Sequence, residues 1–481
     1  MNTCKKELVQ GLRSILAREY VLSEKEEVLV YECDALAIYR TLPIAVVLPA
    51  TTEEVVEVVK LAARMGVPFV ARGAGTGLSG GALPSEEGIL IGFSRMNRIL
   101  ELDVANRRAV VQPGVVNLHL SEAVGPMGYY YAPDPSSQMA CTLGGNAAEN
   151  SGGPHCLKYG VTTNHVLGIE MVLPNGEIAR LGGSVEDVPG LDLRGVIIGS
   201  EGTLGVITQL TVRLLPLPEG TKTMLAVFNS MDSACQSVSD IIANGIIPAA
   251  LEMIDRHTIR AVQKTLESGF PRTATAVLLI ELDGPAAGME EGVQEIERAC
   301  RMNDATEFRV AQTQEERTRL WDGRKKAFGA LGQLSPNFYC LDGTVPRSQL
   351  AEAIRRIEAI GEKHGLTIAN VFHAGDGNLH PIILFDERNP GETEKTIRAG
   401  SEILQMCVEL GGSLTGEHGI GVEKMVDLPA QFSEDAIETM KKVKAVFDPG
   451  GTCNPAKIFP TPGRCGEVKA GRRRVPAGLW I

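Results

Sequence analysis

Close pairs of cysteines are missing from this sequence. Its ten cysteines are scattered, and no two of them are spaced as CxxC. Zinc ribbons and iron–sulfur clusters are usually held by such pairs, so we expect neither in this chain. We interpret the cysteines as reduced thiols, most of them buried.

Long apolar runs and an excess of basic residues are also missing. No apolar run approaches the ~18 residues that span a bilayer, and residues 1–8 lead into no apolar segment typical of a secretory signal. The net charge is −12 at pH 7, which argues against nucleic-acid binding because that requires a basic face. We expect a cytoplasmic protein with no integral membrane segment.

Glycine, in contrast, is abundant. The 481 residues include 53 glycines, about 11% against a usual ~7%. The apolar fraction of 44% and the charged fraction of 22% are ordinary for a globular chain, and the length suggests two to four domains or lobes. The position of the extra glycines therefore becomes the informative question.

Strand patterns dominate the first half of the chain. Residues 51–66 predict a helix with Thr51 at its N-cap, and residues 67–71 predict a strand that runs into a glycine-rich loop. Asn175-Gly176 predicts a hairpin turn. We also expect strands at residues 88–93, 108–112, 195–199 and 206–214. Beyond a linker at 216–220, strands alternate with helices, which predicts an α+β lobe.

The first glycine-rich loop fits three interpretations. Residues 75–80 match GxGxxG and residues 77–81 match GxSxG, but a dinucleotide fingerprint or a nucleophile elbow needs a helix directly afterwards. Residues 80–84 (GGALP) will not start one. We favour the third interpretation, a loop whose backbone N–H groups surround a phosphate. Residues 142–153 and 199–207 have the same character, so three loops suggest a large phosphorylated ligand.

These segments carry a family resemblance that covers nearly the whole chain. Residues 68–77 resemble the pyrophosphate loop of vanillyl-alcohol-oxidase-type FAD-binding domains, and residues 133–136 and 453–457 resemble other parts of the flavin site. The chain is most similar to glycolate oxidase FAD-linked subunits, D-lactate dehydrogenases and D-2-hydroxyglutarate dehydrogenases. Some members bind FAD covalently through a histidine where this chain has Thr76, so non-covalent FAD is expected. The resemblance implies that FAD is bound by Gly73, Ala74, Gly75, Thr76, Gly77, Ser79, Gly80, Pro133, Thr142, Gly145, Asn150, Ser151, Gly152, Gly205, Ile207 and Asn454.

Three of the eight histidines lie in two short motifs. Asp376-Gly377 favours a tight turn, which would fold His373 and His380 toward each other. The second motif, residues 415–421, adds Glu417 and His418. Two imidazoles and one carboxylate form a common divalent metal site, and zinc, manganese and iron all remain open. Taken alone, this cluster also permits a metal-dependent hydrolase.

The resemblance implies a role for each of these residues. His373, His380 and Glu417 would be metal ligands, His418 the catalytic base, and Arg324 the group that binds a substrate carboxylate. A 2-hydroxy acid chelates a metal through its carboxylate and hydroxyl oxygens, and a histidine base suits removal of the hydroxyl proton near neutral pH. The implied reaction oxidises a 2-hydroxy acid to a 2-oxo acid.

The substrate and the electron acceptor are less constrained. Phe328, Cys340 and Ile382 occupy places where diacid-oxidising relatives hold polar residues, which favours glycolate, then D-lactate, over D-2-hydroxyglutarate. Without a cluster of its own, the chain must pass electrons to another molecule. The resemblance implies iron–sulfur and accessory flavoprotein-like subunits, or an electron-transfer flavoprotein, and such a complex would hold the protein peripherally at a membrane.

The expected organisation is an α+β protein in four parts. Residues 1–219 form a two-subdomain, PCMH-type FAD-binding domain, and residues 220–425 form an α+β cap with an antiparallel sheet that holds the substrate and the metal. Residues 426–462 return to the FAD-binding domain. Residues 463–481 form a flexible tail with three consecutive arginines, which either contacts a partner or is a solvated end.

Overall fold

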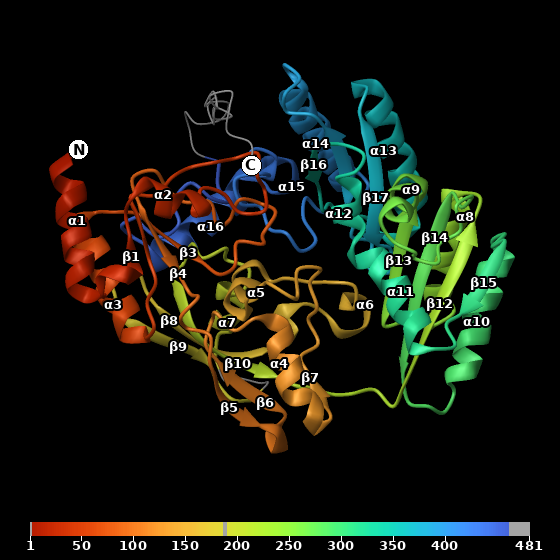
Figure 1. Cartoon of the computed structure of the whole chain (residues 1–481), viewed down its shortest axis with the longest axis horizontal. Helices are drawn as coiled ribbons and strands as arrows, with labels where there is room; N and C mark the ends of the chain where they lie inside the picture. Colours follow the sequence, from red (N-terminus) through yellow and green to blue (C-terminus); the bar gives the residue numbers. More distant parts are fainter. Residues whose placement is uncertain (1, 186–189, 461–481) are drawn as a thin grey trace.

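The computed structural model describes residues 2–185 and 190–460. The predicted tail, residues 463–481, lies outside them. The chain forms two lobes (Figure 1). One contains the N-terminal half together with the C-terminal helices, and the other contains the middle of the chain. Among the described residues, no helix is long and apolar enough to cross a membrane.

A four-stranded sheet and three helices form the first layer of the N-terminal lobe. Its strand order is β1–β2–β4–β3. Thr51 Oγ1 accepts a hydrogen bond from the Glu54 N–H at 3.2 Å, and Gly66 ends the helix in a left-handed conformation, so the predicted helix is confirmed. The elements are α1 (Asn2–Ile15), β1 (Val21–Leu22), α2 (Lys25–Val28), β2 (Ala45–Val47), α3 (Thr52–Met65), β3 (Phe69–Arg72) and β4 (Ile89–Gly92).

A five-stranded antiparallel sheet, ordered β5–β6–β10–β8–β9, forms the second part of this lobe. The predicted hairpin at Asn175-Gly176 joins β8 and β9. Helices α4 and α5 place apolar side chains in the core of this sheet. The elements are β5 (Ile99–Asp103), β6 (Arg108–Val111), α4 (Asn117–Val124), β7 (Tyr129–Tyr130), α5 (Leu143–Glu149), α6 (Cys156–Tyr159), β8 (Val166–Val172), β9 (Ile178–Gly182), α7 (Leu193–Ile197), β10 (Val206–Arg213) and β11 (Leu215–Pro216).

Two sequence predictions in this lobe are wrong. Residues 195–199, expected to be a strand, lie mostly in helix α7, whose N-cap Asp192 accepts a hydrogen bond from the Gly195 N–H. Residues 142–153, expected to be a glycine loop, begin with helix α5. Thr142 caps this helix by accepting from the Gly145 N–H, and tertiary packing overrides the low helix propensity of its two glycines.

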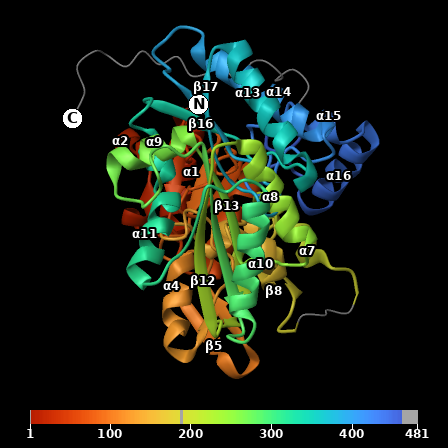
Figure 2. The same ribbon diagram turned by 90° about the vertical axis from the view of Figure 1, so that its right-hand side faces the viewer.

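The second lobe contains a seven-stranded antiparallel sheet with helices on both faces, which confirms the expected cap architecture (Figure 2). The strand order is β15–β12–β14–β13–β17–β18–β16. Helices α8, α10, α13 and α14 share a core with one face, and α9, α11 and α12 share a core with the other. The elements are β12 (Gly220–Phe228), α8 (Met231–Ala243), β13 (Ala250–Asp255), α9 (Arg256–Thr265), β14 (Ala276–Gly284), α10 (Met289–Met302), β15 (Glu307–Val310), α11 (Gln314–Lys325), α12 (Ala327–Leu331), β16 (Asn337–Cys340), α13 (Leu350–His364), β17 (Thr367–His373), β18 (Pro381–Phe385) and α14 (Glu392–Glu409).

The last described segment returns to the N-terminal lobe, as expected. It contains α15 (Leu428–Gln431) and α16 (Glu434–Phe447). Cys453 then forms a parallel bridge with Phe69 at the start of β3. The Asn454 side chain donates to the Gly81 and Glu201 carbonyls at 2.9 and 2.7 Å. The C-terminal segment thus stabilises the loop that follows β3.

Candidate active site

A cavity lies where the two lobes meet. The N-terminal lobe contributes the loop after β3, the start of α5 and residues near the start of β10. The second lobe contributes Lys325, Phe328 and Phe338, and the cavity continues to His380, Glu417 and His418. The predicted cofactor loops and two of the three predicted metal ligands, His380 and Glu417, therefore line one cavity, although they lie far apart in the sequence.

Most of the residues that the resemblance assigned to FAD line this cavity. The lining includes Gly73, Ala74, Gly75, Thr76, Gly77, Thr142, Gly145, Ser151, Gly152, Gly205 and Ile207. The expected absence of a helix after the first loop is confirmed, because no helix occurs between β3 and β4. A Cβ atom on Gly73 would collide with Thr142 Oγ1. The loop can therefore pack against the start of α5 only with glycine at this position, which brings two glycine-rich segments together in the cavity wall. A wall of exposed backbone groups of this kind fits a flavin nucleotide.

The other five predicted residues are not in the lining. Ser79 is buried, and its carbonyl accepts hydrogen bonds from the Val422 and Glu423 N–H groups. The side chains of Asn150 and Asn454 and the backbone carbonyl of Pro133 form hydrogen bonds with other protein groups instead. These residues, together with Gly80, hold the loops that line the cavity.

Two carboxylates in the cavity wall were missed by the sequence analysis. Glu201 accepts the N–H groups of Ile420 and Gly421, both at 2.7 Å, and so connects the N-terminal lobe to the loop that carries His418. Glu149 lies beside it, and burial followed by repulsion from Glu201 raises the pKa of Glu149 well above 4.5. Glu201 lies in the glycine-rich segment 199–207, but no neighbouring residue indicated which groups it would bond.

The turn after β17 brings two histidines together, as predicted. The His373 N–H donates to the Asn378 carbonyl at 3.1 Å, and Gly377 has a φ of 82°. The rings of His373 and His380 meet edge to face, with centroids 5.0 Å apart. The ring of His418 stacks on His380, also at 5.0 Å.

Glu417 completes a group of metal-binding atoms. Its Oε1 lies 3.4 Å from His373 Nε2 and 3.1 Å from His380 Nε2. The Nδ1 atoms point away, because Glu252 bonds His373 Nδ1 at 2.7 Å and the Leu341 carbonyl bonds His380 Nδ1 at 3.1 Å. Two imidazole nitrogens and a carboxylate oxygen within 4.8 Å of one another fit a divalent cation.

The charges within this group are strongly coupled. Burial lowers the pKa of His373, but the Glu252 and Glu417 carboxylates outweigh it and raise that pKa well above 6.5. For His418, burial dominates and lowers the pKa to about 4. His418 is therefore a neutral imidazole in this environment.

Arg324 lies behind the histidines. It is 1% exposed, and its Nε donates to Glu252 Oε2 at 2.6 Å while the other oxygen of Glu252 bonds His373. Arg324 Nη2 is buried with no hydrogen-bond partner among the described residues. Arg324 is not in the cavity lining, and Glu252, which the sequence gave no reason to select, connects it to His373.

Asp342 positions the loop that carries Glu417 and His418. Its Oδ2 accepts the N–H groups of Gly416, Glu417 and His418 at 3.0, 2.8 and 2.6 Å. Lys424 Nζ lies 2.8 Å from Oδ1. Despite burial, Lys424 and His418 lower the pKa of Asp342 to about 2. The sequence contained no local signal for this role.

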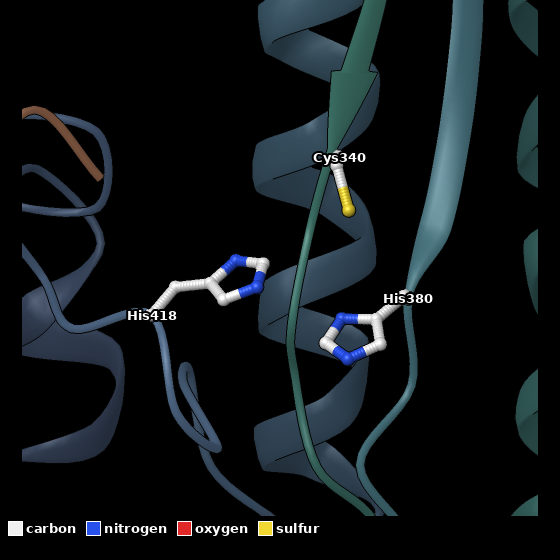
Figure 3. A group of neighbouring side chains, drawn as sticks. All are labelled: Cys340, His380 and His418. Carbon is white, nitrogen blue, oxygen red and sulfur yellow. The ribbon is translucent and has the colours of Figure 1, made fainter. Parts of the chain in front are cut away.

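The three residues predicted to govern substrate size lie in or beside the same site. Phe328 lines the cavity and contacts Phe338, with ring centroids 6.2 Å apart. Cys340 and Ile382 are buried and face each other in the β16–β18 pair. Cys340 also lies beside His380 and His418 (Figure 3).

Comparison with known sequences identifies both parts of the chain. Residues 43–182 match the FAD binding domain family, and residues 217–458 match the family of FAD linked oxidases, C-terminal domain. Glycolate oxidase subunit GlcD of Escherichia coli (strain K12) is 49% identical over 96% of this chain and 93% of its own. D-lactate dehydrogenase of Archaeoglobus fulgidus is 35% identical over 86% of this chain and 90% of its own.

Solved structures share the fold. p-Cresol methylhydroxylase has a TM-score of 0.80 at 18% identity, covering 95% of this chain and 97% of its own. 4-Ethylphenol oxidase of Gulosibacter chungangensis has a TM-score of 0.78 at 19% identity, covering 96% and 98%. The family matches and the sequence relatives favour an oxidoreductase over the hydrolase that the histidine cluster alone permitted. From its two domain matches and its relatives, the chain belongs to the FAD-linked oxidases.

Proposed function

We propose that this FAD-linked oxidoreductase oxidises a small 2-hydroxy acid to the 2-oxo acid, with glycolate as the first candidate and D-lactate as the second. The observation that carries the proposal is the meeting of the glycine-lined cavity with the His373–His380–Glu417 group. A hydride acceptor and a Lewis acid would then act on the same substrate carbon and its hydroxyl. The names of the relatives support this substrate class.

In this proposal, His373, His380 and Glu417 hold a divalent cation, and the cavity-lining loops hold non-covalent FAD. The bound cation would lower the pKa of the substrate hydroxyl, and FAD would accept the hydride. The ligand set fits zinc, manganese or iron. Glu252 and the Leu341 carbonyl orient the two imidazoles, so that both Nε2 atoms face Glu417.

His418 is the proposed base that takes the hydroxyl proton. Its imidazole lies in the cavity wall, with Nε2 3.9 Å from Glu417 Oε1, next to the proposed metal position. Arg324 is the proposed partner of the substrate carboxylate. Its unpartnered Nη2 supports this role, because a buried guanidinium N–H without an acceptor is costly unless a ligand supplies one.

The proposed substrate is small. Phe328 lines the cavity with an apolar ring, and Cys340 and Ile382, buried beside the site, carry no charge that could bind a second carboxylate. D-2-hydroxyglutarate is therefore the least favoured of the three substrates.

The proposed electron acceptor is another protein, either iron–sulfur and accessory subunits or an electron-transfer flavoprotein. The relatives named as subunits support this. We place the protein in the cytoplasm, peripheral to a membrane only through such a complex.

Anaerobic reduction of the purified, flavin-loaded protein tests the proposal. Glycolate or D-lactate should bleach the flavin absorbance, and D-2-hydroxyglutarate should do so more slowly. A His418→Gln variant should retain flavin and metal but reduce the flavin about 10²–10⁴-fold more slowly, as expected for loss of a general base. A colourless protein that binds no FAD, or a clear preference for the diacid, would contradict it.

A further inference from the structure

Cys340 places a thiol beside two imidazoles of the site (Figure 3). One ligand atom from each of Cys340, His380 and His418 lies within 4.8 Å of the other two, and His373, His380 and Glu417 form a separate group of the same kind. The two groups share only His380. They therefore define two neighbouring positions for a cation, one with nitrogen and oxygen ligands and one with sulfur and nitrogen ligands. Because a neutral imidazole has a single unprotonated nitrogen, His380 can serve only one of these positions at a time.

Strand pairing places the thiol next to His380. Cys340 ends β16 and faces Ile382 in β18, and His380 immediately precedes β18. Cys340 is 3% exposed and His380 2%. The ring of His418 stacks on His380 with an interplanar angle of 14°. These three side chains are consequently held in place by the sheet and by ring packing, as a preformed ligand group requires.

Two members of this group, Cys340 and His418, have few other partners among the described residues. The third, His380, is engaged through both nitrogens: Nδ1 bonds the Leu341 carbonyl at 3.1 Å, and Nε2 lies 3.1 Å from Glu417 Oε1. Within residues 2–185 and 190–460, His418 Nδ1 is buried and makes no hydrogen bond; its nearest acid, Asp342 Oδ1, lies 4.0 Å away. In the part of the chain that the structure describes, the Cys340 thiol makes one hydrogen bond, a weak one to the Leu341 carbonyl at 3.5 Å. A sulfur ligand and two imidazoles select softer cations than a group that contains a carboxylate.

We propose that Cys340, His380 and His418 form a second cation site, selective for a thiophilic divalent ion such as Cd²⁺ or surplus Zn²⁺, and that its occupation inhibits the enzyme. The thiol proton is released to solvent as the metal–sulfur bond forms, and no group is oxidised or reduced. The bound ion coordinates the imidazole of His418, so this imidazole can no longer accept a proton from the substrate. The inhibitory effect rests on the proposed function, in which His418 is the base, whereas the binding itself does not.

Titration of the flavin-loaded protein with Cd²⁺ tests binding and inhibition separately. Binding is followed by the sulfur-to-cadmium charge-transfer absorbance in the difference spectrum, and inhibition by anaerobic flavin reduction with glycolate or D-lactate. The wild-type protein should develop the absorbance and lose activity in parallel, and a chelator should restore the activity. Cys340→Ala should lack the absorbance and need at least about tenfold more Cd²⁺ for the same inhibition.

Cys407→Ala is the matched control, because Cys407 is also a buried cysteine of the second lobe but lies on α14. It should behave like the wild-type protein. If Cys340→Ala does not fold with flavin bound, Cys340→Ser replaces it. Absorbance that persists without Cys340, or inhibition that is unchanged without it, overturns the proposal. A protein that shows the Cys340-dependent absorbance but oxidises no hydroxy acid supports the binding site and contradicts the proposed function.

Discussion

Two buried carboxylates position most of the polar side chains at this site. Glu252 is fully buried and bridges Arg324 to His373, one oxygen to each. Asp342 accepts three consecutive backbone N–H groups of the loop that carries Glu417 and His418. Neither is in the cavity lining, so both act through the residues they hold.

Glu252→Gln should be strongly destabilising. The amide keeps the size of the side chain but removes the charge that balances Arg324 and His373, and breaking a buried ion pair costs about 3–5 kcal/mol. Denaturant unfolding of the metal-free protein measures the loss. Glu352→Gln, which removes an exposed carboxylate paired with Arg355 on α13, is the control and should have little effect. Equal losses in the two variants would argue against a central role for Glu252.

Asp342→Asn should weaken metal binding. Asparagine keeps only one accepting oxygen and no charge, so either the loop N–H groups or Lys424 Nζ loses its acceptor, and the anchor of the loop is weakened. Changes to residues that orient metal ligands typically reduce metal affinity by about 10–100-fold. Elemental analysis after dialysis against graded chelator measures this. Asp386→Asn, at an exposed site bonded to Arg388, should retain wild-type metal content. Wild-type affinity in Asp342→Asn would show that the loop does not need this anchor.

At the scale of single elements, the short helix α5 is the least expected part of the site. Its first residues are Leu-Gly-Gly, a composition that favours a loop. Gly144 packs against the backbone of Pro113. A Cβ atom on residue 144 would lie 2.9 Å from the carbonyl oxygen of Pro113. This close approach requires glycine, and it brings Thr142 and Gly145 into the cavity wall.

Gly144→Ala should therefore destabilise the protein, although alanine favours helices. Overpacking against a backbone that cannot move costs about 1–3 kcal/mol, and weaker FAD retention should accompany it. Gly125→Ala is the control, because a Cβ there meets nothing within 4 Å and the backbone is already helical. That variant should be neutral or slightly stabilising. Thermal unfolding and the flavin-to-protein absorbance ratio distinguish the two variants, and a neutral Gly144→Ala would contradict the packing argument.

At the scale of the whole molecule, a polar cluster outside the His373–His380–Glu417 group joins the two lobes. His155 lies between Asp134, at 2.7 Å, and Glu281 of β14, at 3.3 Å, and its ring stacks on Trp321. The Tyr159 hydroxyl donates to Asp283 at 2.7 Å. The cavity is formed by both lobes, so these contacts help to set its width.

The contribution of His155 to stability should depend on pH. Burial lowers its pKa, but Asp134 and Glu281 outweigh this and raise the pKa to about 10. A pKa raised above the unfolded value of about 6.5 means that the stabilisation is complete below pH ~6.5 and is lost as pH rises toward ~10. The difference in Tm between wild type and His155→Gln should therefore shrink over this interval. A constant difference would contradict a charged His155.

Much of the site was predictable because it depends on local sequence. The glycine run after β3, the turn at Asp376-Gly377 and the Glu417-His418 pair are each specified by neighbouring residues, through backbone conformation or capping. Helix α3, the β8–β9 hairpin and the alternation of strands and helices in the second lobe were predicted for the same reason. Residues 195–199 were not, because their apolar pattern fits a short buried helix as well as a strand.

The sequence by itself indicated the glycine-rich loops, the approach of His373 and His380, the Glu417-His418 pair and the α+β cap, since spacing and turn chemistry specify them locally. Only the tertiary structure decided that one cavity joins the glycine-rich loops to the histidine motifs. It also decided that Glu252 bridges Arg324 to His373, and that Glu201 accepts hydrogen bonds from a loop 219 residues away. These contacts join distant segments whose approach depends on the packing of two lobes. A lone buried carboxylate has no local signature, because its partners are chosen by the fold.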